Sequence, residues 1–314
     1  MSRTPVNTRR LPPFVLAPPR AHAHLDLLAM ALLVVCCASW GLQQVAVKVA
    51  LPSVPPLIQA GLRSIVAALL VWAWMVLRRD PVWVRDGTLA WGLGAGLLFT
   101  VEFVLIYWGL EFTNASRAVI FLYLSPFVVA LGAWLFLPGE RLRTVQVVGL
   151  ACAFSGILVV FGESLALPDR RMLIGDAMLV SAALLWGATT VLIKASPLAT
   201  ASAGRVLLYQ LGVSALCLPL GALLLGERWP QEITAVAVAS LLYQAVWVAF
   251  ITYLVWFWLV RHYPAPKLAS FTFLAPLFGV AAGGLLLAEP MSPGLLAALV
   301  LVATGIWLVN RRPG

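Results

Sequence analysis

Two charged side chains, Arg63 and Glu102, stand inside long apolar runs of this 314-residue sequence. A charged group in the hydrocarbon of a membrane costs roughly 2.5–3.5 kcal/mol on insertion scales, so each such charge needs a reason. If both runs are helices that rise about 1.5 Å per residue, the two side chains lie roughly 12 Å below the same surface. One interpretation is an ion pair that locks two helices together. The other is that both face a cavity, where Arg63 meets a carboxylate and Glu102 carries a proton or an ammonium group. The two roles compete, because an ion pair with Arg63 keeps Glu102 ionised.

A short segment with polar and aromatic residues occurs twice in the chain. The first copy, WGLQQVAVK, runs from Trp40 to Lys48, and the second, WGATTVLIK, runs from Trp186 to Lys194. The two lysines lie near opposite ends of their helices, either as interfacial anchors or as gate charges at opposite mouths of a cavity. Polar residues occupy matching places inside the two copies, where they line a cavity or bond helices together: Gln43, Gln44, Thr189 and Thr190.

The aromatic residues fall into two groups. Those near the ends of the apolar runs are typical of the belts that Trp and Tyr form at membrane surfaces. Four lie deeper and are candidates for the wall of a pocket for an apolar or aromatic substrate: Trp40, Trp186, Tyr243 and Trp247. The three-to-four spacing of Tyr243, Gln244 and Trp247 places them on one helix face, which makes Gln244 a further candidate.

Pro126 and Pro276 fall in the middle of two apolar runs. A proline inside a helix removes a backbone hydrogen bond and bends the helix. Paired breaks of this kind can act as hinges, or as places where carbonyl groups face a cavity. The alternative is a static kink, which membrane helices tolerate.

Composition indicates that membrane helices carry these residues. Hydrophobic residues make up 62% of the chain and charged residues 11%, against about half and about a quarter in soluble domains. This excludes a soluble enzyme, a nucleic-acid-binding domain and a disordered regulator. The net charge of +9 comes from basic residues scattered over the loops. Because they form no patch, the charge does not indicate a nucleic-acid partner.

Ten apolar runs are long enough to cross a bilayer, which takes about 20 residues. They cover 27–47, 56–77, 89–110, 114–137, 144–161, 172–193, 204–225, 236–259, 265–288 and 294–310. A basic, Pro-rich tail over 1–26 precedes them, and we expect it to be disordered. Cytoplasmic loops carry an excess of Lys and Arg, and a cytoplasmic N-terminus places fifteen of these residues on that side and five on the other. Ten crossings then place both termini in the cytoplasm.

The two halves of the chain also match over a longer segment. YWGLEFTNASRAVIFLYLSPFVVALGAWLFLPGE, which begins at Tyr107, matches FWLVRHYPAPKLASFTFLAPLFGVAAGGLLLAE, which begins at Phe257. The offset corresponds to five apolar runs, and an odd number means that the second copy enters the membrane upside down. We therefore predict an all-α membrane protein with ten transmembrane helices from two inverted five-helix repeats, over 27–162 and 172–310. Inverted repeats are typical of alternating-access transporters.

The matched segments resemble the EamA-type transporters of the drug/metabolite transporter (DMT) superfamily. In the first half the resemblance rests on WGLQQVAVKVALPSVPPL and LRSIVAALL, and in the second on GDAMLVSAALLWGATTVL and LAPLFGVAAGGLLLAEPMSP. Each piece alone is a loose apolar pattern, but their order and duplication are specific, and they cover nearly everything after residue 26. The resemblance implies export or exchange of small metabolites, often amino acids, through a central cavity. Glu102 departs from the family pattern.

The predicted function is therefore a secondary transporter that moves an amino acid or a related small metabolite by alternating access. The resemblance implies that this is efflux across the inner membrane of a bacterium. One alternative is an exporter of drug-like or other metabolites, and a passive channel is another. A primary pump is not expected, because the sequence has no Walker A motif.

We do not expect an enzyme, a cofactor or a metal site. All three His residues lie outside the apolar runs, no run carries two acids, and the four Cys have no metal-ligand spacing. Chemistry inside a membrane requires groups of this kind. The expected partners are a small-molecule substrate, the lipid bilayer and, as a candidate for coupling, a proton. The oligomeric state stays open.

Overall fold

The computed structural model describes residues 25–113, 115–137, 143–162, 168–230, 232–287 and 294–311. Within these ranges every regular element is a helix: α1 (Leu27–Ala50), α2 (Pro56–Leu77), α3 (Thr88–Phe112), α4 (Ala115–Leu122), α5 (Ser125–Phe136), α6 (Thr144–Phe161), α7 (Arg170–Ala195), η2 (Pro197–Thr200), α8 (Ala203–Leu224), α9 (Ala235–Leu242), η3 (Tyr243–Thr252), α10 (Tyr253–His262), α11 (Ala265–Phe271), α12 (Leu274–Leu287) and α13 (Leu295–Asn310). Of these, η2 is a 3-10 helix and η3 is a π-helix. Residues 1–24 of the expected tail lie outside the described ranges.

Eight helical segments of the described chain are long and apolar enough to cross a membrane: Leu27–Val47, Pro56–Leu77, Thr88–Gly109, Thr144–Phe161, Arg170–Ala195, Ala203–Leu224, Ala235–His262 and Ala265–Ala282. Two shorter apolar helices cover Ile120–Phe136 and Leu295–Asn310. In lipid, every backbone N–H and C=O must be bonded within the protein, and a helix achieves this inside one segment. The predicted all-helical, multi-pass membrane fold is confirmed at this level, and the count of ten spans stays a prediction.

Two of the apolar runs that are continuous in the sequence form broken helices. The run 114–137 forms α4 and α5, and the run 265–288 forms α11 and α12. Pro126 lies in the first turn of α5 and Pro276 in the first turn of α12. The first N–H groups of a helix have no partner within it, so a proline at this position removes no helical hydrogen bond. The prolines therefore begin new helices instead of bending long ones.

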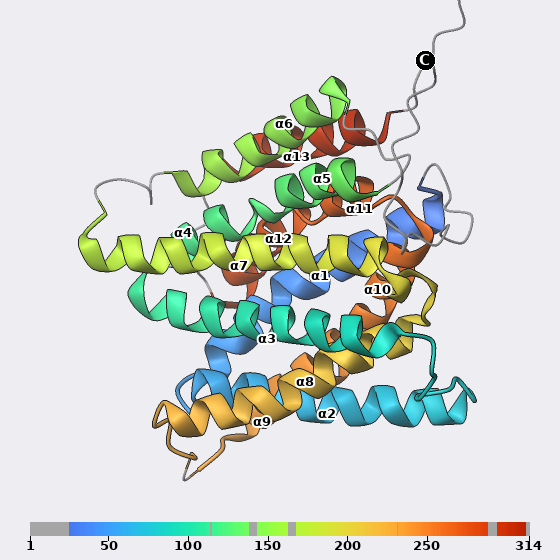
Figure 1. Ribbon diagram of the computed structural model, residues 1–314. Coiled ribbons are helices and arrows are strands. Elements are labelled where there is room, and N and C mark those ends of the chain that lie inside the picture. Colours follow the sequence, from blue (N-terminus) through green and yellow to red (C-terminus); the bar gives the residue numbers. More distant parts are fainter. Residues whose placement is uncertain are drawn as a thin grey trace, which may run out of the picture.

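The helices lie side by side in one bundle, whose opposite edges are each formed by a helix pair (Figure 1). α6 packs along α13 at one edge, and α2 packs along α8 at the other. Between the two edges, α1 packs on α12 and α3 packs on α7. Each of these four pairs combines a helix from the first half of the chain with one from the second half.

The contact between α6 and α13 depends on glycine. A Cβ atom added to Gly149 of α6 would stand 2.8 Å from the carbonyl oxygen of Gly305 of α13. Two turns further along α6, a Cβ atom on Gly156 would stand 2.9 Å from the carbonyl oxygen of Ala298. Lipid tails are as apolar as the helices, so close packing of small residues takes the place of the hydrophobic effect between membrane helices.

Candidate functional site

The guanidinium group of Arg63, on α2, is fully buried against aromatic rings. The side chain is 0% exposed, and its Nε, Nη1 and Nη2 atoms form no hydrogen bond with the described residues. The guanidinium carbon lies 4.2 Å from the ring centre of Phe103 and 5.9 Å from that of Tyr253. Such a desolvated cation–π contact contributes about 2 kcal/mol, whereas burying an unpaired charge costs several kcal/mol. The aromatic contacts alone do not offset the burial of this charge, so an anionic group is expected close to it.

Glu102, on α3, belongs to the same cluster. Its side chain is 6% exposed, and its charge interacts electrostatically with Arg63 and with Tyr253. No hydrogen bond joins its carboxylate to the Arg63 guanidinium. The structure thus brings together the two charges that stand out in the sequence.

Aromatic side chains at four-residue spacing on α3 cover one side of this cluster. The rings of Phe99 and Phe103 are 4.7 Å apart, and those of Phe103 and Tyr107 are 6.2 Å apart. None of these three residues was predicted from the sequence as a site residue. Their spacing is a usable signal, because residues four apart share a helix face, and Phe99 stands three residues from Glu102 on that face.

Trp40 of α1 completes the aromatic wall on another side. Its ring meets those of Trp256 and Tyr253 edge-on, with ring centres 5.5 and 6.3 Å away. The indole N–H donates a hydrogen bond of 2.9 Å to the Thr252 hydroxyl, which itself donates to the Val248 carbonyl at 2.7 Å. These contacts fix the orientation of the indole ring beside the buried charges.

The ten-residue π-helix η3 lies between the two α-helical parts of the segment Ala235–His262 and packs against α1 and α2. A π-helix bonds residue i to residue i+5, is rare, and is frequent at functional sites. Nothing in the hydrophobic pattern predicted this segment. Its path determines which of the predicted residues Tyr243, Gln244 and Trp247 contact α1 and which contact α2.

Three predicted candidates on η3 tie it to neighbouring helices. The Tyr243 hydroxyl donates to the Ser39 carbonyl at 3.0 Å, and the Trp247 indole N–H donates to the Ser39 hydroxyl at 2.9 Å. Gln244 is fully buried, and its amide donates to Gln59 Oε1 of α2 at 2.8 Å. These bonds give all three residues a role in joining helices close to the Arg63 cluster.

The matching candidates on α7 have other contacts. The ring of Trp186 meets that of Tyr123 edge-on, with ring centres 6.2 Å apart. Thr189 and Thr190 are buried, and their hydroxyls donate to carbonyls one turn earlier in α7, those of Leu185 and Trp186. The two copies of the repeated segment therefore have different surroundings.

The remaining predicted candidates lie on α1 and at the end of α7. Gln43 is half-buried on α1, and Lys194 is half-buried in the last turn of α7. Gln44 and Lys48 belong to α1, but their side chains lie outside what the structure describes. Among the described residues, no group of three His, Cys, Asp or Glu side chains is placed to hold a metal ion.

A polar cluster that the sequence did not suggest links the loop between α2 and α3 to the start of α8. Arg205 Nη1 donates to Asp86 Oδ2 at 2.7 Å, and Thr88 donates to Asp86 Oδ1 from its N–H at 3.1 Å and from its hydroxyl at 2.6 Å. Partial burial by itself raises the pKa of the Asp86 carboxyl, but the Thr88 hydrogen bonds and the Arg205 charge outweigh it and hold the pKa below 3.8. Because the Thr88 hydroxyl hydrogen points at Asp86, the Tyr209 hydroxyl, 3.1 Å away, donates to Thr88.

Comparison with known proteins gives a consistent picture. The model of the EamA-like transporter family matches residues 27–162 and 173–311. The chain is 30% identical over 278 residues to the uncharacterized transporter YvbV of Bacillus subtilis (strain 168), which covers 87% of this chain and 88% of that protein. It is 29% identical over 290 residues to a probable amino-acid metabolite efflux pump of Salmonella typhimurium (strain LT2), with coverage of 89% and 93%. A solved crystal structure of a protein matches 90% of this chain and 97% of its own with a TM-score of 0.77; at 19% identity this likeness concerns the fold alone.

Proposed function

The chain belongs to the EamA-like transporter family, and we propose that it is a secondary transporter that moves an amino acid or a related small metabolite out of the cell. The descriptions of the family and of its relatives indicate a transporter rather than an enzyme. The efflux pump among the relatives supports the amino-acid class and the outward direction.

The observation that carries this proposal is the buried guanidinium of Arg63, which forms no hydrogen bond with the described residues, in one cluster with the carboxylate of Glu102. A cation and an anion that do not bond each other are complementary to a zwitterion. The substrate carboxylate would accept charge-assisted hydrogen bonds from Arg63, which offers a planar fork of donors. Glu102 would accept from the ammonium group, or would carry a coupling proton when no ammonium group is present.

We further propose ten spans in two inverted repeats over 27–162 and 172–310, which would work by alternating access. α2 and α8 are the second and seventh predicted spans, and α6 and α13 are the fifth and tenth. A two-fold axis that relates two repeats maps each of these pairs onto itself, so their mutual packing supports the repeat. The matching breaks at Pro126 and Pro276 would be the hinges, and Lys48 and Lys194 would act as gates or anchors.

The placement in the membrane follows from charge. The excess of Lys and Arg on one side of the predicted spans supports cytoplasmic N- and C-termini in a bacterial inner membrane. The substrate would then reach Arg63 from the cytoplasm in one state and leave toward the opposite side in the other state.

One observation favours the second candidate function, an exporter of drug-like compounds. The rings of Phe99, Phe103, Trp40 and Tyr253 form an apolar aromatic wall beside the charges. Such a wall suits flat, apolar cations, which Glu102 would pair with and which the aromatic faces would attract. In that case Glu102 is required and Arg63 is not.

A ligand-stabilisation experiment separates the two candidates. The purified protein is heated with amino acids, with the corresponding amines that lack the carboxylate, and with drug-like amines, since a ligand stabilises by RT ln(1 + [L]/Kd). We expect stabilisation by amino acids that Arg63→Ala abolishes and that Arg143→Ala, a change at an exposed arginine, leaves intact. Stabilisation by amines alone, lost on Glu102→Gln, would favour the drug-like class. Uptake that is unchanged in both Arg63→Ala and Glu102→Gln would overturn the proposed site.

A further inference from the structure

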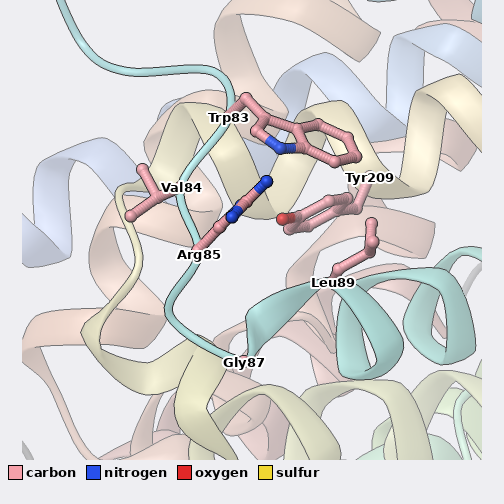
Figure 2. A pocket seen from close by; sticks show the side chains of 6 residues that line it. All are labelled: Trp83, Val84, Arg85, Gly87, Leu89 and Tyr209. Atoms are coloured by element: carbon pink, nitrogen blue, oxygen red, sulfur yellow. The ribbon is translucent and has the colours of Figure 1, made fainter.

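A hollow of about 190 Å³ lies between the loop that joins α2 to α3 and the side of α8 (Figure 2). Its lining comes from two parts of the chain. The loop and the start of α3 contribute Trp83, Val84, Arg85, Gly87 and Leu89, and α8 contributes Tyr209. Because the loop joins two membrane-spanning segments, the hollow lies at one end of the bundle and not near Arg63.

Arg85 gives this hollow a positive charge. Figure 2 shows its side chain extending from the loop toward the rings of Trp83 and Tyr209. Arg85 forms no hydrogen bond or ion pair with the part of the chain that the structure describes. The neighbouring carboxylate, Asp86, is already engaged by Arg205 and Thr88. The charge of Arg85 is therefore available to an anion.

The surroundings of the hollow are those of a membrane surface. Trp83 is 71% exposed, and Leu77, the last residue of α2, is 84% exposed. Exposed apolar side chains at the end of a spanning helix face lipid, and Trp prefers the level of the lipid headgroups. Leu89, in the first turn of α3, adds an exposed apolar edge to the hollow. An anion that reaches Arg85 at this level meets apolar contacts on its flanks.

The walls of the hollow are held in place by the polar cluster at Asp86. The Tyr209 ring is fixed through its hydroxyl to Thr88, and Thr88 is fixed to Asp86, which pairs with Arg205. Gly87 has a φ of 77°, and a Cβ atom there would meet nothing within 4 Å. The positive φ is the reason for glycine at this turn, which connects Arg85 and Asp86 to the start of α3.

We propose that this hollow binds an anionic phospholipid, with the headgroup phosphate on Arg85 and the upper part of an acyl chain along Trp83 and Leu89. A basic pocket between membrane helices is a known type of site for lipid headgroups. Free phosphate carries the same negative charge as a lipid headgroup, but it has no acyl chain to contact Trp83 and Leu89. The expected ligand is therefore the lipid. The proposal requires only that the chain lies in a membrane, and it does not depend on what is transported.

The test uses the full chain, purified in a neutral detergent and titrated with phosphatidylglycerol, with phosphatidylcholine or with inorganic phosphate. Thermal stability and native mass spectrometry report binding. We expect phosphatidylglycerol to stabilise the protein more than phosphatidylcholine does. Arg85→Gln should weaken the apparent affinity for phosphatidylglycerol about fivefold, since one basic residue near a membrane surface contributes about 1 kcal/mol.

Two further variants make the outcome decisive. Leu89→Trp keeps the charge but fills the hollow, and it should weaken binding as Arg85→Gln does. Arg311→Gln removes the same charge from an exposed arginine that lies against Trp307, outside the hollow, and it should leave the affinity unchanged. Equal weakening by Arg85→Gln and Arg311→Gln would overturn the proposal, because it would show nonspecific attraction. Stabilisation by inorganic phosphate that matches the lipid's would overturn it as well.

Discussion

Tyr123 and Phe273 pack against each other with their ring centres 6.3 Å apart, and each stands at the break of a broken helix. Tyr123 lies between α4 and α5, and Phe273 lies between α11 and α12. The sequence match that sets Pro126 on Pro276 also sets Tyr123 on Phe273. Contact between corresponding residues is expected close to a two-fold axis, where a surface meets its own copy.

We predict that Phe273→Ala destabilises the protein strongly. The side chain is fully buried, and its ring also meets those of Phe127 and Phe154, with ring centres 6.4 Å away in each case. Removing it leaves a cavity between the broken helices and should cost about 3 kcal/mol or more. Tyr123→Phe, which keeps the ring, should cost less than about 1.5 kcal/mol. Thermal unfolding in detergent measures both, and equal shifts for the two variants would contradict the packing described.

Arg63→Met distinguishes a binding role from a structural lock. Burying a charge that has no bonded counter-charge costs several kcal/mol, and an apolar residue of similar length removes that cost. Since Arg63 has no hydrogen-bond partner among the described residues, we expect the melting temperature of the substrate-free protein to hold or rise. Transport of the substrate should be lost at the same time. A large fall in stability would instead indicate an ion pair with Glu102.

Gly149→Ala should destabilise the contact between α6 and α13. The new Cβ atom would stand 2.8 Å from a backbone oxygen of Gly305, and backbone cannot rotate away as a side chain can. We expect a loss of about 1–3 kcal/mol, typical of overpacking. Gly212→Ala, in the middle of α8, is the matched control because a Cβ atom there meets nothing within 4 Å. The control should be neutral or stabilising by up to about 1 kcal/mol. The melting temperatures of the two variants, each compared with that of the wild type, test this prediction; equal shifts would contradict the close contact described.

Asp86→Asn should lower stability near neutral pH by about 1 kcal/mol, a modest value because the ion pair is partly exposed. The pKa of Asp86 is lower in the folded chain than its ordinary value of 3.8. The carboxylate therefore contributes stability above pH 3.8, and this contribution is lost as the pH falls through the folded value. The gap between the melting temperatures of wild type and variant should close below that pH. Asp80→Asn, in the same loop, is the control and should lower the melting temperature less near neutral pH, because no hydrogen bond or ion pair joins the Asp80 carboxylate to the described residues.

Cysteine labelling checks the inverted topology. In a background without the four native cysteines, Leu51→Cys and Thr200→Cys each place one thiol just after a copy of the repeated segment. Both positions are exposed in the structure. An impermeant maleimide should label Leu51→Cys in intact cells and Thr200→Cys only in inside-out vesicles. Labelling of both from the same side would refute the inverted repeat, and with it the alternating-access proposal.

The charged residues of the site could be found without a structure, because a charge in an apolar run is costly wherever the run folds. Arg63 and Glu102 were identified on that ground alone. The aromatic residues that surround them were not, since Phe99 and Phe103 resemble ordinary lipid-facing residues in a span that is apolar on every side. Only the packing that brings Phe103 of α3 and Tyr253 of α10 to Arg63 distinguishes rings that face the guanidinium from rings that face lipid.

The all-helical membrane fold was set by composition and by the length of the apolar runs, because lipid leaves a backbone little choice other than a helix. The tertiary structure decided the features that depend on contacts between distant segments. The breaks before Pro126 and Pro276 are placed where the two halves meet, and the π-helix η3 forms where Gln244 reaches Gln59. The Asp86–Arg205 pair joins a loop to a helix from the other half of the chain. A hydropathy pattern describes a single segment, so it carries no information about which two segments pack against each other.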